Sequence, residues 1–315
     1  MSGQETILTK RRRIDRVAKH LFLSFAIFPI VLVILIVISL WVRTQPILRS
    51  HTLIELLTGQ IWRPLQGQFG YFPFIMGTLW VTVVAMLLAV PPCLLTAIYL
   101  SEYAHKTMKS IAKPLLDLLS GIPSVVYGVW GMVAVVPWVQ NQVGPLVYKW
   151  LGGLPLFHLE NPTGFNIVSG GIVLGVMVAP LIIAVSYEVM YSVPEALRQA
   201  SLALGATRWQ TIARCVIPKA APGIIAAIVL GFSRAFGETM AVLMVVGNVP
   251  KVPTSVFDPA YPLTALIANN YGEMMSIPLY DAALLGAALV LLVIVLLFNL
   301  VSALVLNRII GKPTR

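Results

Sequence analysis

The chain has 315 residues, of which 58% are hydrophobic and 11% are charged. Ordinary soluble domains carry about 25% charged residues, so this composition excludes a soluble globular protein and predicts several membrane-spanning segments. The formal net charge of +10 could suggest a nucleic-acid partner, but the basic residues are distributed in a way that indicates membrane orientation instead.

Six apolar runs lie along the chain, near 21–42, 73–101, 115–138, 167–188, 222–247 and 280–306. Each is long enough for one helix to cross a hydrocarbon core of about 30 Å. The first run exceeds the apolar core of about 7 to 15 residues found in signal peptides, so we expect it to remain as a span. The sequence therefore predicts an all-α, polytopic protein with six transmembrane helices, made of a basic segment (1–20), one membrane domain (21–306) and a short tail (307–315).

Most lysines and arginines outside the runs fall in alternate segments, at 10–19, 106–113, 198–219 and 308–315. By the positive-inside rule these segments, and with them both termini, are expected to be cytoplasmic. A basic arm that contacts anionic headgroups is a second interpretation of the first cluster. Three acidic residues near the inside ends of spans are expected to be interfacial carboxylates, solvated or paired: Glu102, Asp117 and Glu188.

Hydroxyl side chains in the second and third runs are candidates for lining a pathway. Thr78 and Thr82 are four residues apart, so they share one helix face. More often such hydroxyls bond to carbonyls of their own helix. Ser124 follows Pro123, which frees backbone groups within the membrane, although a kink needed for packing explains this pattern equally well.

The segment between the fourth and fifth runs predicts a helical hairpin, residues 193–217. Ser192 and Glu195 have the spacing of a capping box, which starts a helix that Gly205 ends. Thr207 and the glutamine three residues later repeat this spacing and start a second helix.

In that second helix, apolar side chains recur at helical spacing until Pro218 ends it: Trp209, Ile212, Ala213 and Val216. Such a stripe must be covered. It could lie on lipid headgroups as an amphipathic element, or it could dock into a groove of a soluble partner. Periodicity alone leaves these two alternatives even.

The fifth run carries two charged residues, Arg234 and Glu238. An arginine at the bilayer centre costs roughly 2.5 to 3.5 kcal/mol, whereas an i,i+4 ion pair on an exposed helix returns only about 0.2 to 0.5 kcal/mol. We therefore expect both charges to face the bundle interior or a wet cavity. One interpretation is a structural salt bridge. The sharper one is that Arg234 offers its guanidinium to a passing anion, while Glu238 holds it when no anion is present.

The stretch QASLALGATRWQTIARCVIP, residues 199–218, resembles the EAA motif of ABC-importer permeases, the cytoplasmic hairpin with which those subunits engage their ATPase. Four residues fall in register with that motif: Ala200, Ser201, Gly205 and Pro218. Gln199 stands where the family usually has glutamate. The resemblance implies a set of ATPase-coupling residues, namely Gln199, Ala200, Ser201, Gly205, Trp209 and Pro218.

Two further stretches, GIPSVVYGVWG (121–131) and SRAFGETMAV (233–242), resemble the PstC-type permeases of the phosphate-specific ABC importer. The resemblance covers nearly the whole chain and implies a type I ABC-importer permease in the inner membrane of a bacterium. Its expected partners are a paralogous PstA-type permease, two ATPase subunits and an extracytoplasmic phosphate-binding protein, with membrane lipid around it and no nucleic acid. It also favours the anion-contact role of Arg234, with Glu238, Thr78, Thr82 and Ser124 along the substrate pathway.

Other functional classes fit less well. An intramembrane enzyme would need a clustered nucleophile and base, or metal ligands, at membrane depth, and we expect neither catalytic residues nor a metal site. The chain lacks a G-x-x-x-x-G-K-[ST] loop, so we expect no cofactor in this chain and expect ATP and Mg to be used by the partner ATPase subunits. A passive anion channel would also place a basic residue in a pore, but it has no need of a docking hairpin. A permease for another oxyanion, such as sulfate or molybdate, stays an alternative.

Overall fold

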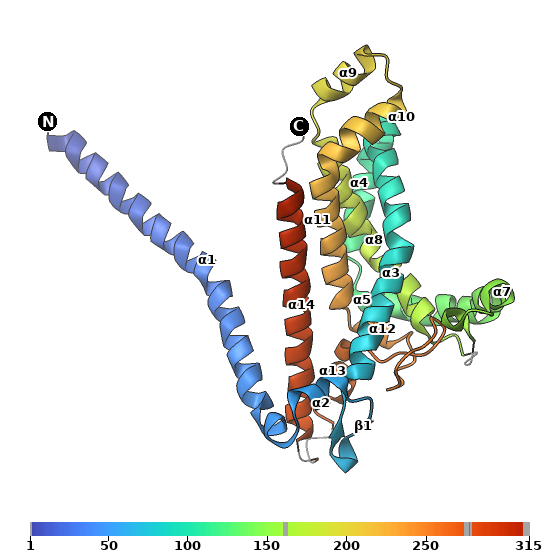
Figure 1. Ribbon diagram of the computed structural model, residues 1–315. Helices are drawn as coiled ribbons and strands as arrows, with labels where there is room; N and C mark the ends of the chain where they lie inside the picture. The colour runs from blue at the N-terminus through green and yellow to red at the C-terminus, as the bar shows by residue number, and fades with distance from the viewer. Residues whose placement is uncertain (1, 160–162, 274–276, 278, 311–315) are drawn as a thin grey trace.

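The computed structural model describes residues 2–159, 163–273, 277 and 279–310. These residues are mostly helical (Figure 1). The helices and strands are α1 Ser2–Ser50, α2 Leu53–Thr58, β1 Trp62–Arg63, β2 Gln68–Phe69, α3 Phe72–Ile98, α4 Lys106–Ser120, α5 Ser124–Trp130, α6 Val136–Trp138, α7 Gly144–Leu151, α8 Ile167–Tyr191, α9 Glu195–Ala203, α10 Arg208–Thr211, α11 Ile217–Phe236, α12 Met240–Leu243, α13 Leu263–Asn270 and α14 Tyr280–Ile310. Short π-helical turns continue several of them, at Tyr99–Tyr103, Gly131–Val135, Val139–Val143 and Ile212–Val216.

Five helical stretches in the described chain are long and apolar enough to cross a membrane: Asp15–Ser50, Phe72–Tyr103, Ile167–Tyr191, Arg208–Phe236 and Tyr280–Leu304. A sixth is present if α4 and the helix that continues to Leu151 are taken as one bent span. This agrees with the predicted all-α, polytopic architecture. The α9–α10 hairpin, the start of α1 and the end of α14 lie toward one end of the bundle, with α2 and β1 at the other (Figure 1).

The third expected span, near 115–138, is not one straight helix. The chain turns by 90° between α4 and the helix that begins at Ser124. The backbone N–H of Gly121 closes α4 by donating to the carbonyls of Asp117 and Leu118, and Pro123 disfavours helical backbone at the residue before it. The segment from Ser124 to Leu151 consequently projects sideways from the bundle, with α7 at its outer end (Figure 1).

The fifth expected span is shifted toward the hairpin. One helix runs from Arg208 through the π-helical turn and α11 to Phe236, so the prediction that Pro218 ends the second hairpin helix is wrong. Pro218 lies at the start of α11, directly after the π-helical turn, where a proline bends a helix without ending it. At the other end the helix stops at Gly237, although the apolar run continues to residue 247.

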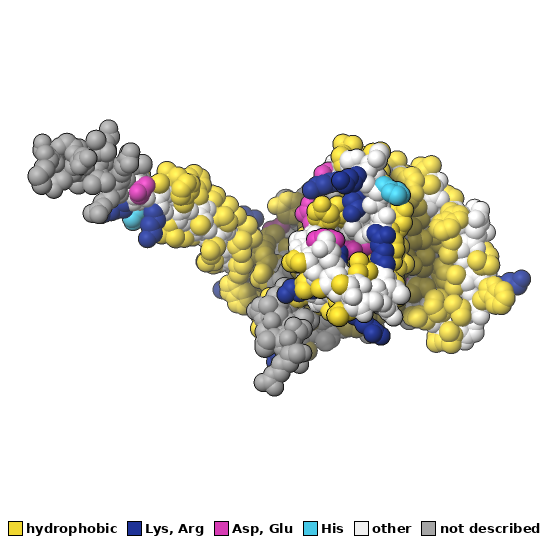
Figure 2. Space-filling model, turned by 90° about the horizontal axis from the view of Figure 1, so that it is seen from above, with side chains coloured by type: hydrophobic (Ala, Val, Ile, Leu, Met, Phe, Trp, Pro, Cys, Tyr) yellow, Lys and Arg dark blue, Asp and Glu magenta, His cyan; other side chains and the backbone are white. Residues whose placement is uncertain are grey.

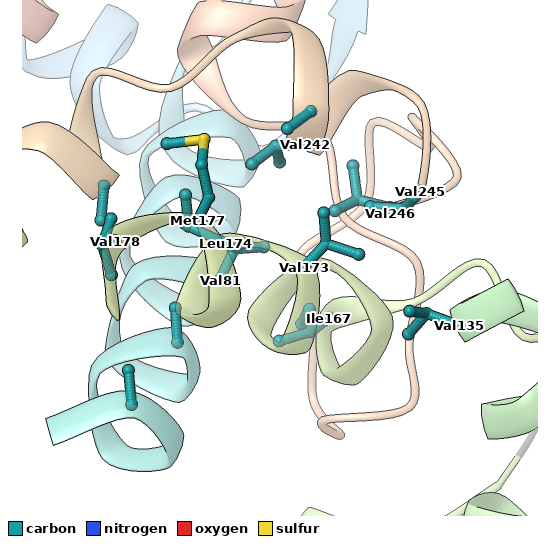
Figure 3. Packing of buried hydrophobic residues seen from close by; sticks show 14 of the residues in the cluster. Val81, Val135, Ile167, Val173, Leu174, Met177, Val178, Val242, Val245 and Val246 are labelled. Carbon is teal, nitrogen blue, oxygen red and sulfur yellow. The ribbon is translucent and has the colours of Figure 1, made fainter. Parts of the chain in front are cut away.

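The core explains why that run continues beyond the helix. Val242, Val245 and Val246 are buried against α8 and against Val81 of α3, around Leu174 (Figure 3). The apolar character of these residues thus reflects burial in the protein core and not a continuation of the membrane-spanning helix.

Small residues bring the two central helices close together. A Cβ added at Gly171 of α8 would lie 2.6 Å from Val84 Cγ1 of α3, and one at Gly175 would lie 3.2 Å from the carbonyl oxygen of Ala85. Such close approach between helix backbones is typical of packing in membranes. α3 and α8 therefore form one packed unit through the middle of the bundle.

The end of the bundle opposite the hairpin has a second core. It joins the C-terminal part of α1 to α2, α13 and the start of α14, through Ile47, Leu56 and Leu263 among others. Tyr71 donates its hydroxyl hydrogen to the carbonyl of Ala283, 2.7 Å away, which fixes the start of α3 to α14. From this core α1 leans away from the bundle (Figure 1), with its apolar side chains exposed.

Candidate functional site

Two helices break at the same place in the bundle. α4 ends at Ser120 and α11 ends at Phe236. Arg234 Nη2 donates to the Ser120 carbonyl oxygen at 3.4 Å, so the two helix ends adjoin. α4 has 15 residues and is therefore about 22 Å long, because an α-helix rises 1.5 Å per residue. We call residues 120–124 and 234–239 the paired breaks.

The helices that follow the paired breaks also meet. α12 packs on α5 at Gly128, where an added Cβ would lie 3.2 Å from the Cα of Ala241 and 3.3 Å from the Met240 carbonyl oxygen. The close contact leaves no room for a side chain at position 128.

Arg234 lies half-buried in the last turn of α11. Its contact with Ser120 places it at the carboxyl end of α4, where unpaired carbonyls carry partial negative charge. Among the residues that the structure describes, the other guanidinium N–H groups have no hydrogen-bond partner. They are available for the paired, two-point contact that a guanidinium makes with an oxyanion.

Glu238 does not occupy the place that the sequence suggested for it. Because the helix ends at Gly237, residue 238 is not one helical turn from Arg234. Glu238 Oε1 accepts instead from the backbone N–H of Ala241, at 3.2 Å, and so caps the first turn of α12. Within the described chain the two side chains form no ion pair, so the expected pairing of Arg234 with Glu238 is not found.

Thr78 and Thr82 are buried and bond back to their own helix. The Thr78 hydroxyl donates to the Phe74 carbonyl and the Thr82 hydroxyl to the Thr78 carbonyl, both at 2.8 Å. This is the structural alternative stated for them above. Both nevertheless line a small pocket together with Glu238. Arg234 is not part of that lining.

The same pocket includes Thr264 of α13, which is not among the predicted pathway residues because it lies between the fifth and sixth apolar runs. The Thr264 hydroxyl donates to the Glu238 carbonyl at 2.9 Å, and the backbone N–H of Leu263 donates to Thr78 Oγ1 at 2.9 Å. The sequence signal for this helix is the mainly apolar stretch LTALI, residues 263–267, directly after Pro262.

Ser124 is the first residue of α5, directly after the break, and is half-buried. It lies at the paired breaks but not on the pocket lined by Thr78 and Thr82. The predicted pathway residues therefore form two neighbouring groups, one around Arg234 and one around the pocket.

At the hairpin, α9 ends in the hydrogen-bond pattern of a Schellman motif. The Gly205 N–H donates to the Leu202 carbonyl at 2.9 Å and the Ala206 N–H to the Ser201 carbonyl at 3.2 Å. Gly205 has φ +85°, as this turn requires. The prediction that Gly205 ends the first hairpin helix is confirmed.

Of the two predicted capping boxes, one is present. Thr207 and Gln210 cap α10 reciprocally. The box predicted for Ser192 and Glu195 is wrong, because the Ser192 hydroxyl donates to the Val189 carbonyl at 2.8 Å and the Glu195 carboxylate turns toward Arg198, 3.7 Å away.

The predicted coupling residues lie on the hairpin surface. Gln199, Ala200, Gly205, Trp209 and Pro218 are exposed, and Ser201 is half-buried and hydrogen-bonded to Thr211. The apolar stripe predicted for the second helix is divided, since Ile212 and Val216 are buried within the chain. Trp209 remains 57% exposed and Leu204 90%. Seen from this end, hydrophobic and charged side chains share the surface (Figure 2).

Acidic residues beneath the hairpin have partners that the sequence did not identify. Glu102 pairs with Arg198 and Glu188 with Lys113, each at 2.8 Å. The expectation that these carboxylates are solvated or paired is confirmed for both, but nothing local in the sequence names their partners.

Most of the chain is similar to known transport proteins. Residues 93–311 match the family described as "Binding-protein-dependent transport system inner membrane component". The Bacillus subtilis protein named "Probable ABC transporter permease protein YqgH" is 37% identical, covering 95% of this chain and 94% of its own. The "Phosphate transport system permease protein PstC" of Mesorhizobium japonicum is 33% identical over 97% of both chains, and that of Haemophilus influenzae is 32% identical over 96% of this chain and 98% of its own.

Solved structures show the same fold. A chain from the "bacterial ABC transporter involved in the import of the acidic polysaccharide alginate" is 19% identical, with a TM-score of 0.55 over 94% of this chain and 98% of its own. A chain of the inward-facing MetNI methionine ABC transporter gives a TM-score of 0.52 at 19% identity, over 74% of this chain and 93% of its own. The predicted ABC-importer permease fold is thereby confirmed.

Proposed function

The chain belongs to the family of binding-protein-dependent transport system inner membrane components, and on this premise we propose that it is the membrane permease subunit of an ATP-driven importer of inorganic phosphate. The observation that carries the proposal is the similarity, over nearly the full length of both chains, to proteins named as phosphate transport permeases. The permease crosses the inner membrane of a bacterium with its hairpin and both termini in the cytoplasm.

The paired breaks are the place where phosphate contacts this subunit. Discontinuous helices near the middle of the membrane are where transporters commonly bind substrate. Arg234 supplies a permanent positive charge there, with N–H groups free to meet two phosphate oxygens. The half-buried guanidinium is anchored by a single long hydrogen bond to Ser120, so an anion can engage it without breaking a strong ion pair.

The hairpin is the docking surface for the ATPase. Leu204 and Trp209 present exposed apolar area at its tip, a feature that calls for a covering partner. ATP and Mg bind to the ATPase subunits, and this chain performs no hydrolysis. A PstA-type permease completes the pathway and an extracytoplasmic protein delivers phosphate. Movement of the docked ATPase shifts the hairpin and opens the pathway alternately to either side.

The test is uptake by the complete importer, reconstituted in vesicles with its ATPase subunits, its partner permease and its binding protein. Labelled phosphate should accumulate only when ATP and the binding protein are both supplied, and unlabelled sulfate or molybdate should compete weakly. Uptake that proceeds without ATP would identify a passive channel. Preferential uptake of sulfate or molybdate would assign the permease to another oxyanion.

A further inference from the structure

An ion pair beneath the hairpin is largely buried. Arg198 of α9 meets Glu102, in the π-helical turn that follows α3, at two points: Nη2 to Oε1 at 2.8 Å and Nε to Oε2 at 3.2 Å. The two side chains are 13% and 7% exposed. A two-point contact of this kind fixes direction as well as distance. The hydrogen bond to Glu102 raises the pKa of Arg198, and a guanidinium is in any case charged in proteins.

Glu102 also holds the second helix of the hairpin. Arg208, the first residue of α10, donates through Nη2 to the backbone carbonyl of Glu102. Its guanidinium carbon lies 4.7 Å from the ring centre of Tyr103, within the range of a cation–π contact. Both hairpin helices thus contact one residue at the end of α3, and the hairpin cannot shift relative to α3 without breaking one of these contacts.

Arg198 reaches α8 as well. Its Nη2 donates to the Met190 carbonyl at 2.9 Å, and its Nη1 donates to the Val193 carbonyl just beyond the helix. Carbonyls at a helix end lack partners within the helix, so the guanidinium both closes α8 and joins it to Glu102. The hairpin is consequently attached to both members of the packed α3–α8 unit.

α3 leads from this attachment to the paired breaks. Thr82 and Glu102 are separated by about 30 Å of helix at 1.5 Å per residue, and Thr78 and Thr82 line the pocket that includes Glu238. Pro91 and Pro92 lie inside α3, and there Cys93 Sγ contacts the Ala179 carbonyl of α8 at 3.8 Å. α8 therefore supports α3 where its own hydrogen bonding is interrupted.

We propose that Glu102 is the positioning residue that couples the hairpin to the pathway, transmitting hairpin movement to α3 through Arg198 and Arg208. The inference rests on the proposed function, because the movement originates in an ATPase docked on the hairpin. It assigns to Glu102 a role distinct from docking and distinct from contact with the transported anion.

The first test is Glu102→Gln in the complete reconstituted importer. Glutamine keeps the size of the side chain and the backbone carbonyl that Arg208 uses, and removes only the charge that faces Arg198. We expect normal membrane levels and normal ATPase co-purification, with a several-fold fall in phosphate ions taken up per ATP hydrolysed. A purely structural role would lower uptake and hydrolysis together. A constant ratio, whether the two rates fall or stay normal, would overturn the proposal.

Glu188→Gln is the matched control. The Lys113–Glu188 pair has the same 2.8 Å separation, but both side chains are 60% exposed and the pair joins α4 to α8 without touching the hairpin. The uptake-to-hydrolysis ratio should therefore equal that of the unchanged protein. A fall as large as that of Glu102→Gln would show that any lost charge at this end of the bundle has the effect, and would overturn the assignment to Glu102.

A covalent link provides the complementary test. Cys93 and Cys215 are the two native cysteines and are first replaced by alanine. Glu102→Cys with Arg198→Cys should then uncouple uptake from hydrolysis, and joining the two thiols with a short bifunctional reagent should restore the ratio. A linked protein that stays uncoupled would overturn the mechanical role.

The experiments distinguish failure of the phosphate-import proposal from failure of the Glu102 proposal. The ratio of anions taken up per ATP hydrolysed is measured with whichever anion the unchanged importer carries. ATP-driven uptake of another anion, with a lowered ratio in Glu102→Gln, would remove phosphate from the proposed function and leave the coupling role standing. Uptake by the unchanged protein without ATP would overturn both.

Discussion

Gly205→Ala should weaken binding of the ATPase subunit through the backbone alone. Gly205 has φ +85° at the end of α9, and an added Cβ would meet no atom within 4 Å. No clash therefore contributes. The remaining effect is conformational, since left-handed backbone costs a residue with a Cβ about 1 to 2 kcal/mol.

That cost sets the size of the effect. A change of one to two kcal/mol alters an equilibrium by a factor of roughly 5 to 30. Leu204 and Trp209 lie on either side of the turn, and both must face the partner for the hairpin to dock. Alanine favours other conformations of the free hairpin, and docking must restore the native turn. The dissociation constant should therefore rise by at most about 5- to 30-fold.

The measurement is a titration of the purified ATPase subunit onto the permease pair in nanodiscs. Gly67→Ala is the matched control, because Gly67 has φ +70°, also has no atom within 4 Å of an added Cβ, and lies at the opposite end of the bundle. Its dissociation constant should match that of the unchanged protein. Unaltered binding by Gly205→Ala, or equal weakening by both variants, would refute the reasoning.

Three further predictions concern the paired breaks and the pocket. Arg234→Gln should abolish phosphate uptake in vesicles while the ATPase subunit still co-purifies, and normal uptake at normal membrane levels would contradict the anion-contact role. Glu238→Gln should reduce uptake less than Arg234→Gln does, which the same assay compares. Thr78→Val leaves the Leu263 N–H without its acceptor and should lower the free energy of unfolding by about 1 to 3 kcal/mol. Thr82→Val, which loses a bond only to its own helix, should cost less in denaturation experiments, and equal losses would contradict this assignment.

Hydropathy located the apolar residues but not the ends of the helices. Hydropathy predicts a span that continues to residue 247, but Val242, Val245 and Val246 in this run are buried in the protein core. Lipid and a protein core both favour apolar side chains, so hydropathy does not distinguish a membrane span from a buried core segment. A proline in the sequence likewise does not show whether the helix ends there or continues. Pro123 lies at a break, whereas the helix continues through Pro218, because packing around Val216 supports the helix across it.

Local signals succeeded where the interaction itself is local. The Thr207 capping box and the Gly205 turn each depend on residues within a few positions, and both are present. The contacts that define the sites are distant in the chain: Arg234 and Ser120 are separated by 114 positions, and Arg198 and Glu102 by 96. No periodicity connects such pairs. The sequence could mark Arg234 as costly in a membrane, but its partner follows only from the fold.

The hydrogen bonds of the three pocket threonines, Thr78, Thr82 and Thr264, affect which ions the pocket can bind. Each hydroxyl donates its hydrogen to a backbone carbonyl oxygen, those of Phe74, Thr78 and Glu238 respectively. A hydroxyl has one proton to give, so these oxygens keep only lone pairs. An anion leaving its hydration shell needs donors, and lone pairs repel it. In this arrangement the three threonines offer an oxyanion no hydroxyl hydrogen, whereas the N–H groups of Arg234 remain available to one.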